Sequence, residues 1–344
     1  MEAVSIANRL WKIQGAAFKY EGATLEEKQA SLRKNLAVGV EAMKPLLEED
    51  LSVDDRLQAA ALQLKLLKLL MKAGEAERSV ELEAALQGLA ASDEPRLRTL
   101  GEEYAIMFSL DGVSTLEPAL QVKRIDAAIA YVLGQAPTKK LLQFAVNCAA
   151  FIEPATEYGP AAKAHQKLAE HFLSADDPAL EKGGKKFQLT AKRLSLPGMS
   201  MELTGTTMEG KSFDVKQLKG KVILVDFWAT WCGPCIAEFP KMKDHYAKYQ
   251  SHGFEIVGVS IDENREHLQH FLDKNEIPWI ILHEEGDEEK QGWKHPVAKQ
   301  YGISAVPCMI LIDADGNVIT TQARGEELER RLESLFPGVE SSES

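Results

Sequence analysis

Residues 221–240 read KVILVDFWATWCGPCIAEFP, and this stretch decides how the second part of the chain is expected to fold. The run 222–227 is apolar and rich in β-branched residues, which predicts a short buried strand. Cys232 and Cys235 follow it directly. Pro234, between them, suits the first turn of a helix, because its missing N–H has no hydrogen bond to lose there. The stretch therefore predicts a strand, a sharp turn and a helix that begins at two thiols.

The predicted position of Cys232 at a helix N-terminus favours thiol chemistry. Free backbone N–H groups and the positive end of the helix dipole stabilise a thiolate there, so we expect Cys232 to have a depressed pKa and to be the nucleophile. Cys235 lies one helical turn further on and can resolve the mixed disulfide that Cys232 forms with a substrate. The pattern predicts a redox-active Cys232–Cys235 disulfide, and no other cofactor is expected.

Two other uses of a CxxC sequence fit less well. A structural zinc site needs four ligands, and the sequence has no second CxxC and no HxxxH pair, so no metal site is predicted. Covalent haem attachment needs a histidine after the second cysteine, where this chain has Ile236. A catalytic dithiol remains the best interpretation.

Residues 225–235, VDFWATWCGPC, resemble the active site of thioredoxin. The wider segment 197–335 is similar to the TlpA/ResA-type thioredoxins, which are grouped with the AhpC/TSA superfamily. The lead-in from Pro197 matches the N-terminal hairpin of that family, residues 235–240 match its PCxxExP helix start, and 254–279 resemble its strand–helix insertion. The resemblance implies an α/β thioredoxin fold with a central mixed sheet and the activity of a thiol-disulfide oxidoreductase.

The resemblance also assigns roles near the cysteines. Asp226 occupies the position of a buried acid beneath them; a carboxylate on an apolar strand is costly to ionise, so we expect a raised pKa that suits proton exchange with Cys235. The alternative is an Asp226 that faces solvent. Pro307 is implied to be the cis-proline opposite the CxxC, which leaves the backbone of Val306 free to pair with an extended substrate.

Further residues are expected to contact substrates. Trp231 is predicted to shield the disulfide and to offer an apolar surface, with Gly233 and Pro234 beside it, whereas Trp228 is expected to be packing. Cys308 stands where the family usually has threonine. It is expected either to pack as a small apolar residue or to act as a third thiol near the site.

Composition limits the remaining possibilities. The chain has 344 residues, of which 45% are hydrophobic and 27% charged, and its net charge of −12 argues against nucleic acid as a partner. Four cysteines imply no disulfide framework. The N-terminal sequence lacks the apolar core of a signal peptide and nothing in the chain is long and apolar enough to span a membrane, which predicts a cytoplasmic protein. Because the resembling family is mostly exported, the alternative is an exported or periplasmic protein whose N-terminus was trimmed.

The chain is expected to have two domains. Residues 1–180 predict an all-α domain, a helical bundle or an irregular helical array, in which Thr24 begins a capping box. Helical spacing and capping signals predict helices over 24–49, 52–74, 78–90, 94–110, 116–133, 139–152 and 161–173. Gly183 and Gly184 among lysines predict a flexible linker at 181–186. A redox domain over 187–336 and a disordered tail over 337–344 complete the prediction.

Together these features predict a thiol-disulfide oxidoreductase that reduces protein disulfides. One alternative is a thiol peroxidase of the AhpC/TSA type, although Val225 and Ala229 stand where its PxxxTxxC pattern has proline and threonine. Another is a non-enzymatic adaptor that acts through the helical domain. The expected partners are protein disulfide substrates, an upstream thiol or membrane reductant, and a protein partner or second copy bound through residues 1–180.

Overall fold

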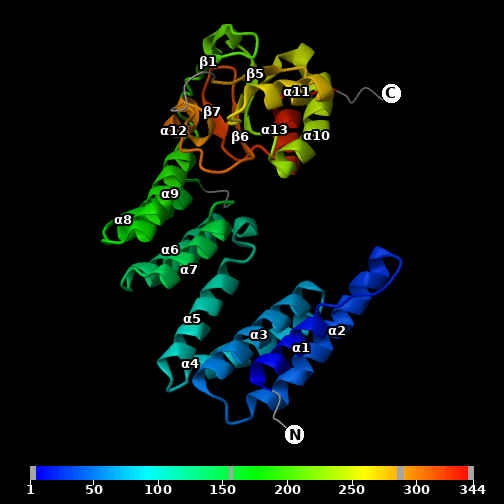
Figure 1. Ribbon diagram of the computed structural model, residues 1–344, viewed down its shortest axis with the longest axis vertical. Coiled ribbons are helices and arrows are strands. Elements are labelled where there is room, and N and C mark those ends of the chain that lie inside the picture. The colour runs from blue at the N-terminus through cyan, green and yellow to red at the C-terminus, as the bar shows by residue number, and fades with distance from the viewer. Residues whose placement is uncertain (1–4, 155–157, 285–289, 340–344) are drawn as a thin grey trace. The chain divides into compact units, whose positions relative to one another are not determined.

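The computed structural model describes residues 5–154, 158–284 and 290–339 (Figure 1). Contacts between Cα atoms divide the chain into two compact units, residues 1–111 and residues 112–344. The first unit is helical, and the second joins four long helices to an α/β domain with a mixed sheet. The predicted fold class, helices followed by a thioredoxin fold, is confirmed.

The first unit is an array of helices around one apolar core. Its helices are α1 (Ile6–Ala17), α2 (Leu25–Leu47), α3 (Val53–Lys72), η1 (Ala76–Arg78), α4 (Ser79–Ala90) and α5 (Pro95–Leu110). The Thr24 hydroxyl accepts from the backbone N–H of Glu27, whose carboxylate accepts from the N–H of Thr24, so the predicted capping box is present. Helix α3 lies at the centre of the core, with Leu64, Leu66 and Leu67 fully buried.

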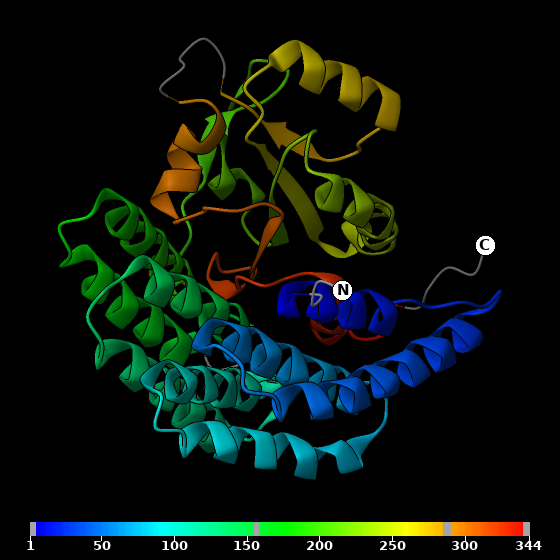
Figure 2. The same cartoon turned by 60° about the horizontal axis from the view of Figure 1, so that its bottom comes forward.

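The second unit begins with further helices that sequence periodicity largely predicts. They are η2 (Val113–Thr115), α6 (Pro118–Leu133), α7 (Lys139–Ile152), α8 (Tyr158–Leu173) and α9 (Pro178–Leu194). Helices α8 and α9, drawn in green, run side by side (Figures 1 and 2).

The predicted linker is wrong, because residues 181–186 lie inside helix α9. Asp177 caps this helix by accepting from the N–H groups of Ala179 and Leu180. The two glycines serve close packing rather than flexibility: a Cβ on Gly183 would lie 2.6 Å from the Leu142 side chain, and one on Gly184 would lie 2.8 Å from that of Leu173. Phe187, the predicted start of the redox domain, also lies inside this helix.

The α/β domain is built on a five-stranded sheet in the order β5-β4-β3-β6-β7. Strands β3 and β4 and strands β4 and β5 are parallel, whereas β6 pairs antiparallel with both β3 and β7, which makes the sheet mixed. The strands are β3 (Val222–Trp228), β4 (Phe254–Ser260), β5 (Ile280–Leu282), β6 (Cys308–Ile312) and β7 (Val318–Thr320). A separate hairpin pairs β1 (Thr204–Thr206) with β2 (Ser212–Asp214) and leads through η3 (Val215–Leu218) into β3.

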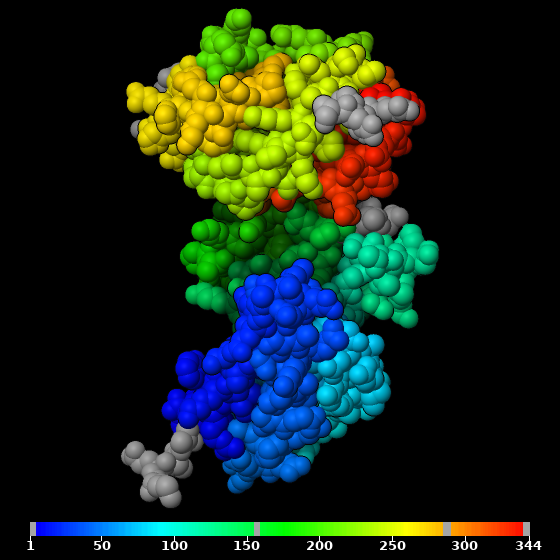
Figure 3. Space-filling view, turned by 90° about the vertical axis from the view of Figure 1, so that its right-hand side faces the viewer, coloured from blue at the N-terminus to red at the C-terminus, as the bar shows by residue number. Residues whose placement is uncertain are grey.

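Helices cover both faces of this sheet. The remaining elements are α10 (Gly233–Tyr249), η4 (Gln250–His252), α11 (Arg265–Asn275), η5 (Gly292–Lys294), α12 (Pro296–Gln300) and α13 (Gly325–Leu335). Leu224 and Trp228 of β3 face a core shared with α10, α11 and α13, whereas Val225 and Phe227 face a core shared with α12 and the segment before β3. The red helix α13 lies beside α10, where Tyr249 stacks on Phe336 (Figures 1 and 3).

Two remaining predictions concern the C-terminal residues and membrane-spanning helices. Within the predicted tail 337–344, residues 340–344 lie outside the described residues, and Val339 packs against the core under α10. Among the helices of the described residues, none combines the length and the apolar character needed to cross a membrane.

Candidate active site

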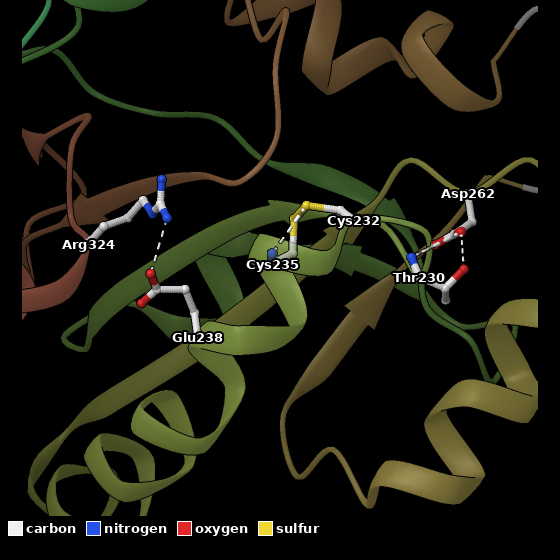
Figure 4. The surroundings of a disulfide bond; sticks show 6 residues. All are labelled: Thr230, Cys232, Cys235, Glu238, Asp262 and Arg324. Carbon is white, nitrogen blue, oxygen red and sulfur yellow. Dashed lines mark hydrogen bonds and ion pairs between the residues drawn. A yellow bond between two sulfur atoms is a disulfide. The ribbon is translucent and has the colours of Figure 1, made fainter. Parts of the chain in front are cut away.

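The two cysteines of the CxxC sequence form a disulfide at the N-terminus of α10 (Figure 4). Their Cα atoms are 5.3 Å apart, and Cys232 is the N-cap residue of the helix. The backbone N–H of Cys235 donates to the Cys232 sulfur over 3.2 Å, as expected for the unpaired N–H groups of a first helical turn. Cys232 is 5% exposed and Cys235 is fully buried, so Cys232 is the more accessible of the two cysteines.

The sheet register brings Asp226 beneath the disulfide. Successive side chains of a strand point to opposite faces, so Asp226 shares a face of β3 with Leu224 and Trp228. That face is the one covered by α10, and Cys235 belongs to the same core. Asp226 is fully buried, which excludes the solvent-facing alternative. Among the described residues neither of its carboxylate oxygens has a hydrogen-bond partner.

The environment of Asp226 makes its ionisation costly. Burial raises the pKa of Asp226 from 3.8 to about 8, with a further increase from the negative charge of Glu238 and an opposing effect of Arg324. Glu238 lies one turn after Cys235 on α10, and its carboxylate pairs with the Arg324 guanidinium at 3.1 Å (Figure 4). The pKa of Asp226 is therefore shifted toward the range in which thiols exchange their protons.

Asp262 fixes the turn that precedes Cys232, a role that sequence reasoning missed. Its carboxylate accepts from the Thr230 backbone N–H at 3.0 and 3.1 Å and from the Thr230 hydroxyl at 2.6 Å (Figure 4). It also accepts from the Ser260 hydroxyl at 2.8 Å. One signal was present in the sequence: Asp262 directly follows the largely apolar run 254–261, and the carboxyl ends of parallel strands meet at one edge of a sheet.

The loop before β6 lies at the same edge of the sheet as the disulfide. Cys308 pairs with Phe227, so Pro307 comes next to the end of β3. The Val306–Pro307 peptide bond is cis, as the resemblance implied. Among the described residues, neither the N–H nor the C=O of Val306 makes a backbone hydrogen bond. An extended chain can therefore pair with Val306.

Cys308 is buried and is not part of a disulfide. Burial raises the pKa of its thiol to about 11, which disfavours the thiolate form that oxidation and disulfide exchange require. The environment favours the packing role over a third reactive thiol.

Two exposed tryptophans lie close together, and one of them, Trp231, directly precedes Cys232 in the chain. Trp231 is 60% exposed, and its ring centroid lies 6.3 Å from that of Trp293, which is also exposed. Trp228 is fully buried between Phe239 and Phe271, as expected of a packing residue. Sequence reasoning did not single out Trp293.

The predicted site residues lie around the start of α10, and Asp262 and Trp293 are added to them. Cys232, Cys235 and Asp226 lie under and at the start of α10, whereas Trp231 and the Val306–Pro307 loop border the disulfide. Gly233 and Pro234 form the first turn of α10. Within the described ranges, no group of three or more His, Cys, Asp or Glu side chains is arranged to hold a metal ion.

Comparisons with known proteins agree with this geometry. Residues 183–335 match the Redoxin family model. The chain is 34% identical over 134 residues to the thiol-disulfide oxidoreductase ResA of Bacillus thuringiensis, which covers 39% of this chain and 72% of the relative. It is 31% identical over 133 residues to ResA of Geobacillus thermodenitrificans, and this match covers 38% of this chain and 72% of the relative.

Among solved structures, the chain is similar to the thioredoxin domain of a thiol-disulfide oxidoreductase from Bacteroides vulgatus, with 29% sequence identity and a TM-score of 0.37. This match covers 40% of this chain and 96% of the solved chain. The extent of the match to the ResA proteins, together with the CxxC disulfide at the start of α10, shows that the chain belongs to the ResA-like, thioredoxin-fold family of thiol-disulfide oxidoreductases.

Proposed function

We propose that this oxidoreductase works as a reductant of protein disulfides, with Cys232 as the nucleophile and Cys235 as the resolving thiol. The observation that carries the proposal is the Cys232–Cys235 pair at the N-terminus of α10, above a buried carboxyl group with a pKa of about 8. The disulfide is the only redox group that the mechanism requires.

The proposed reaction has two exchange steps. In the reduced enzyme, the Cys232 thiolate attacks one sulfur of the substrate disulfide; a mixed disulfide forms and the other substrate sulfur leaves as a thiolate that takes up a proton. The Cys235 thiolate then attacks the Cys232 sulfur, which forms the enzyme disulfide and releases the second substrate thiol. Two electrons pass from the enzyme dithiol to the substrate.

Three features of the site support these roles. The N–H of Cys235 donates to the Cys232 sulfur, and such donation stabilises a thiolate at that position. Leu224 and Trp228, which share a face of β3 with Asp226, belong to the core that contains Cys235, so the Asp226 carboxylate can accept the Cys235 proton as that thiol attacks. The unpaired backbone of Val306, beside Pro307, and the exposed ring of Trp231 can hold an extended substrate segment against the disulfide.

Insulin reduction with dithiothreitol as the electron donor tests the proposal. Cys232→Ser should reduce the rate to the background of dithiothreitol alone. Cys235→Ser should accumulate a mixed disulfide with substrate that mass spectrometry detects. Cys148→Ala changes a buried cysteine of α7 and should leave the rate unchanged. A wild-type rate at background, or full activity in Cys232→Ser, would rule out the mechanism.

The direction of electron flow has its own test. Equilibration of the Cys232–Cys235 couple against glutathione or dithiothreitol buffers gives its reduction potential. A reductant is expected to lie near the thioredoxin value of about −270 mV, and a value near −120 mV would identify an oxidant instead. The electron donor in the cell is proposed to be an upstream thiol or a membrane reductant.

We further propose that residues 1–180 bind a protein partner or a second copy of the chain. Large apolar side chains are exposed in this region, among them Trp11 of α1 and Val80 of α4. Light scattering of the full chain should show a mass above that of a monomer or a complex with the partner, and Trp11→Glu should reduce it. A clean monomer that captures no partner would contradict the proposal.

A further inference from the structure

A cavity of about 510 Å³ lies next to the cis-proline loop. Part of its wall comes from the end of α7 and from α9, and the rest from segments 304–309 and 321–324 of the α/β domain. Helices α7 and α9 precede the thioredoxin fold in the chain, so this cavity combines the fold with the helices added before it.

Two lining residues connect the cavity to the surroundings of the active site. Pro307 lines it and also stands at the sheet edge where β3 leads to the disulfide. Arg324 lines it and pairs with Glu238, which lies one turn after Cys235 (Figure 4). A substrate segment that pairs with Val306 is therefore led directly past Pro307 into the cavity.

The helical wall is held in place by specific contacts. The Gln322 side-chain amide donates to the backbone carbonyl of Glu153, and the Glu153 carboxylate pairs with Arg193 of α9. On the same side, Gly302 is so close to α9 that an added Cβ would lie 2.2 Å from the Leu189 carbonyl oxygen. These contacts make the cavity a formed feature of this unit.

The charge of the lining is positive. Among the described residues that line the cavity, Lys186, Arg193 and Arg324 are cationic and Glu153 alone is acidic. Glu153 is paired with Arg193, and Arg324 is partly neutralised by Glu238. Lys186 is exposed and has no ion pair with the described residues, so its charge is available to a ligand.

We propose that this cavity binds an acidic segment of the substrate protein, adjacent to the cysteine that Cys232 attacks. The proposal rests on the proposed disulfide reductase function and adds a substrate class to it. An extended chain advances about 3.3 Å per residue, so a segment that starts at Val306 places a side chain at the cavity within a few residues. The preferred substrates are thus proteins with Asp or Glu close to a reducible disulfide.

The test uses the full chain and three disulfide peptides of equal length. They differ only beside the cysteine, where they carry two Glu, two Gln or two Lys residues. The expected order of kcat/KM is Glu above Gln above Lys, by about two- to fivefold per step for exposed charge pairs. The difference should shrink as salt is raised, because the Debye length falls from about 30 Å at 0.01 M to about 3 Å at 1 M.

Two matched variants locate the effect. Lys186→Gln should lower kcat/KM for the Glu peptide by about two- to fivefold and leave the Gln peptide unchanged. Lys185→Gln, which removes an exposed α9 lysine outside the cavity lining that pairs with Glu181, should leave all three peptides unchanged.

The outcomes separate the two proposals. Equal kcat/KM for all three peptides, or a preference that Lys186→Gln does not alter, overturns the acidic site and leaves disulfide reduction standing. Failure to reduce even the Gln peptide overturns the proposed function itself.

Discussion

Asp226 carries the least favourable electrostatics in the site, since it combines full burial with carboxylate oxygens that no described group satisfies. Isolated charges in a core are avoided by protonation, which is why its pKa rises. The cost of ionising Asp226 is also what makes it useful, because a carboxyl that titrates near pH 8 can accept a proton from a thiol and return it.

The raised pKa of Asp226 predicts a stability that falls with rising pH. The unfolded chain loses this proton near pH 3.8 and the folded chain only near pH 8, so between these values the folded state binds more protons. At about 1.4 kcal/mol per pH unit, the free energy of unfolding should fall by about 4 kcal/mol between pH 5 and pH 8 because of this group. Asp226→Asn should abolish this part of the loss.

Guanidinium unfolding of the oxidised protein at several pH values measures the effect. The difference between wild type and Asp226→Asn should grow steadily from pH 5 to pH 8. If the free energy of unfolding changed with pH in the same way for both proteins, Asp226 would not hold its proton in the folded state.

Asp262 is predicted to support the active-site turn. Asp262→Ala leaves the half-buried Thr230 N–H and hydroxyl without their acceptor, and hydrogen bonds to charged groups are worth about 1.5–3 kcal/mol each. We expect a loss of roughly 3 kcal/mol in the free energy of unfolding, together with slower insulin reduction. Thr230→Val removes only the hydroxyl bond and should have a smaller effect on both; the reverse order would contradict the assignment.

At the scale of elements, helices α8 and α9 of the second unit pack closely against each other. Gly184 lets the two helices approach, because a Cβ there would lie 2.8 Å from the Leu173 side chain and 3.0 Å from its backbone nitrogen. Backbone atoms cannot move aside as the end of a flexible side chain can.

Gly184→Ala is therefore expected to destabilise the protein by about 1–3 kcal/mol, despite the better helix propensity of alanine. Gly88→Ala is the matched control: this glycine is also helical, but nothing lies within 4 Å of the added Cβ, so the substitution should stabilise by up to about 1 kcal/mol. Thermal unfolding of both variants and the wild type measures these changes in stability. A Gly184→Ala variant that is more stable than the wild type would refute the packing argument.

At the scale of the whole molecule, the second unit contains every residue of the proposed mechanism. A chain of residues 112–344 is predicted to fold and to reduce insulin at a rate within about twofold of the full chain, because the cores around the sheet and the helices α6–α9 remain intact. Circular dichroism and the insulin assay test this. An unfolded or inactive fragment would show that residues 1–111 are needed for folding or catalysis.

A chain that starts at Phe187, the boundary expected from sequence, should behave differently. This cut divides α9 and removes Lys186 and Glu153 from the cavity beside Pro307. Such a fragment is expected to have a lower melting temperature than 112–344 and no preference for acidic peptides. Equal stability and equal preference would indicate that α9 is dispensable.

The sequence by itself determined the features that depend on neighbours in the chain. The buried strand β3, the caps at Thr24 and Ser52 and the placement of Cys232 at a helix start follow from local patterns, because side chains within a few residues supply their hydrogen bonds and periodicity. The resemblance to a known family around the CxxC sequence also predicted the burial of Asp226 and the cis peptide bond before Pro307.

Only the tertiary structure decided the contacts between distant segments. The Glu238–Arg324 pair, the Asp262 contacts with Thr230 and the cavity beside Pro307 join residues that no local pattern relates. The course of α9 belongs to this group as well. In a sequence, two consecutive glycines are typical of a flexible linker. Only the structure shows that Leu142 and Leu173 lie beside Gly183 and Gly184, so that the lack of a side chain at these positions makes room for neighbouring helices.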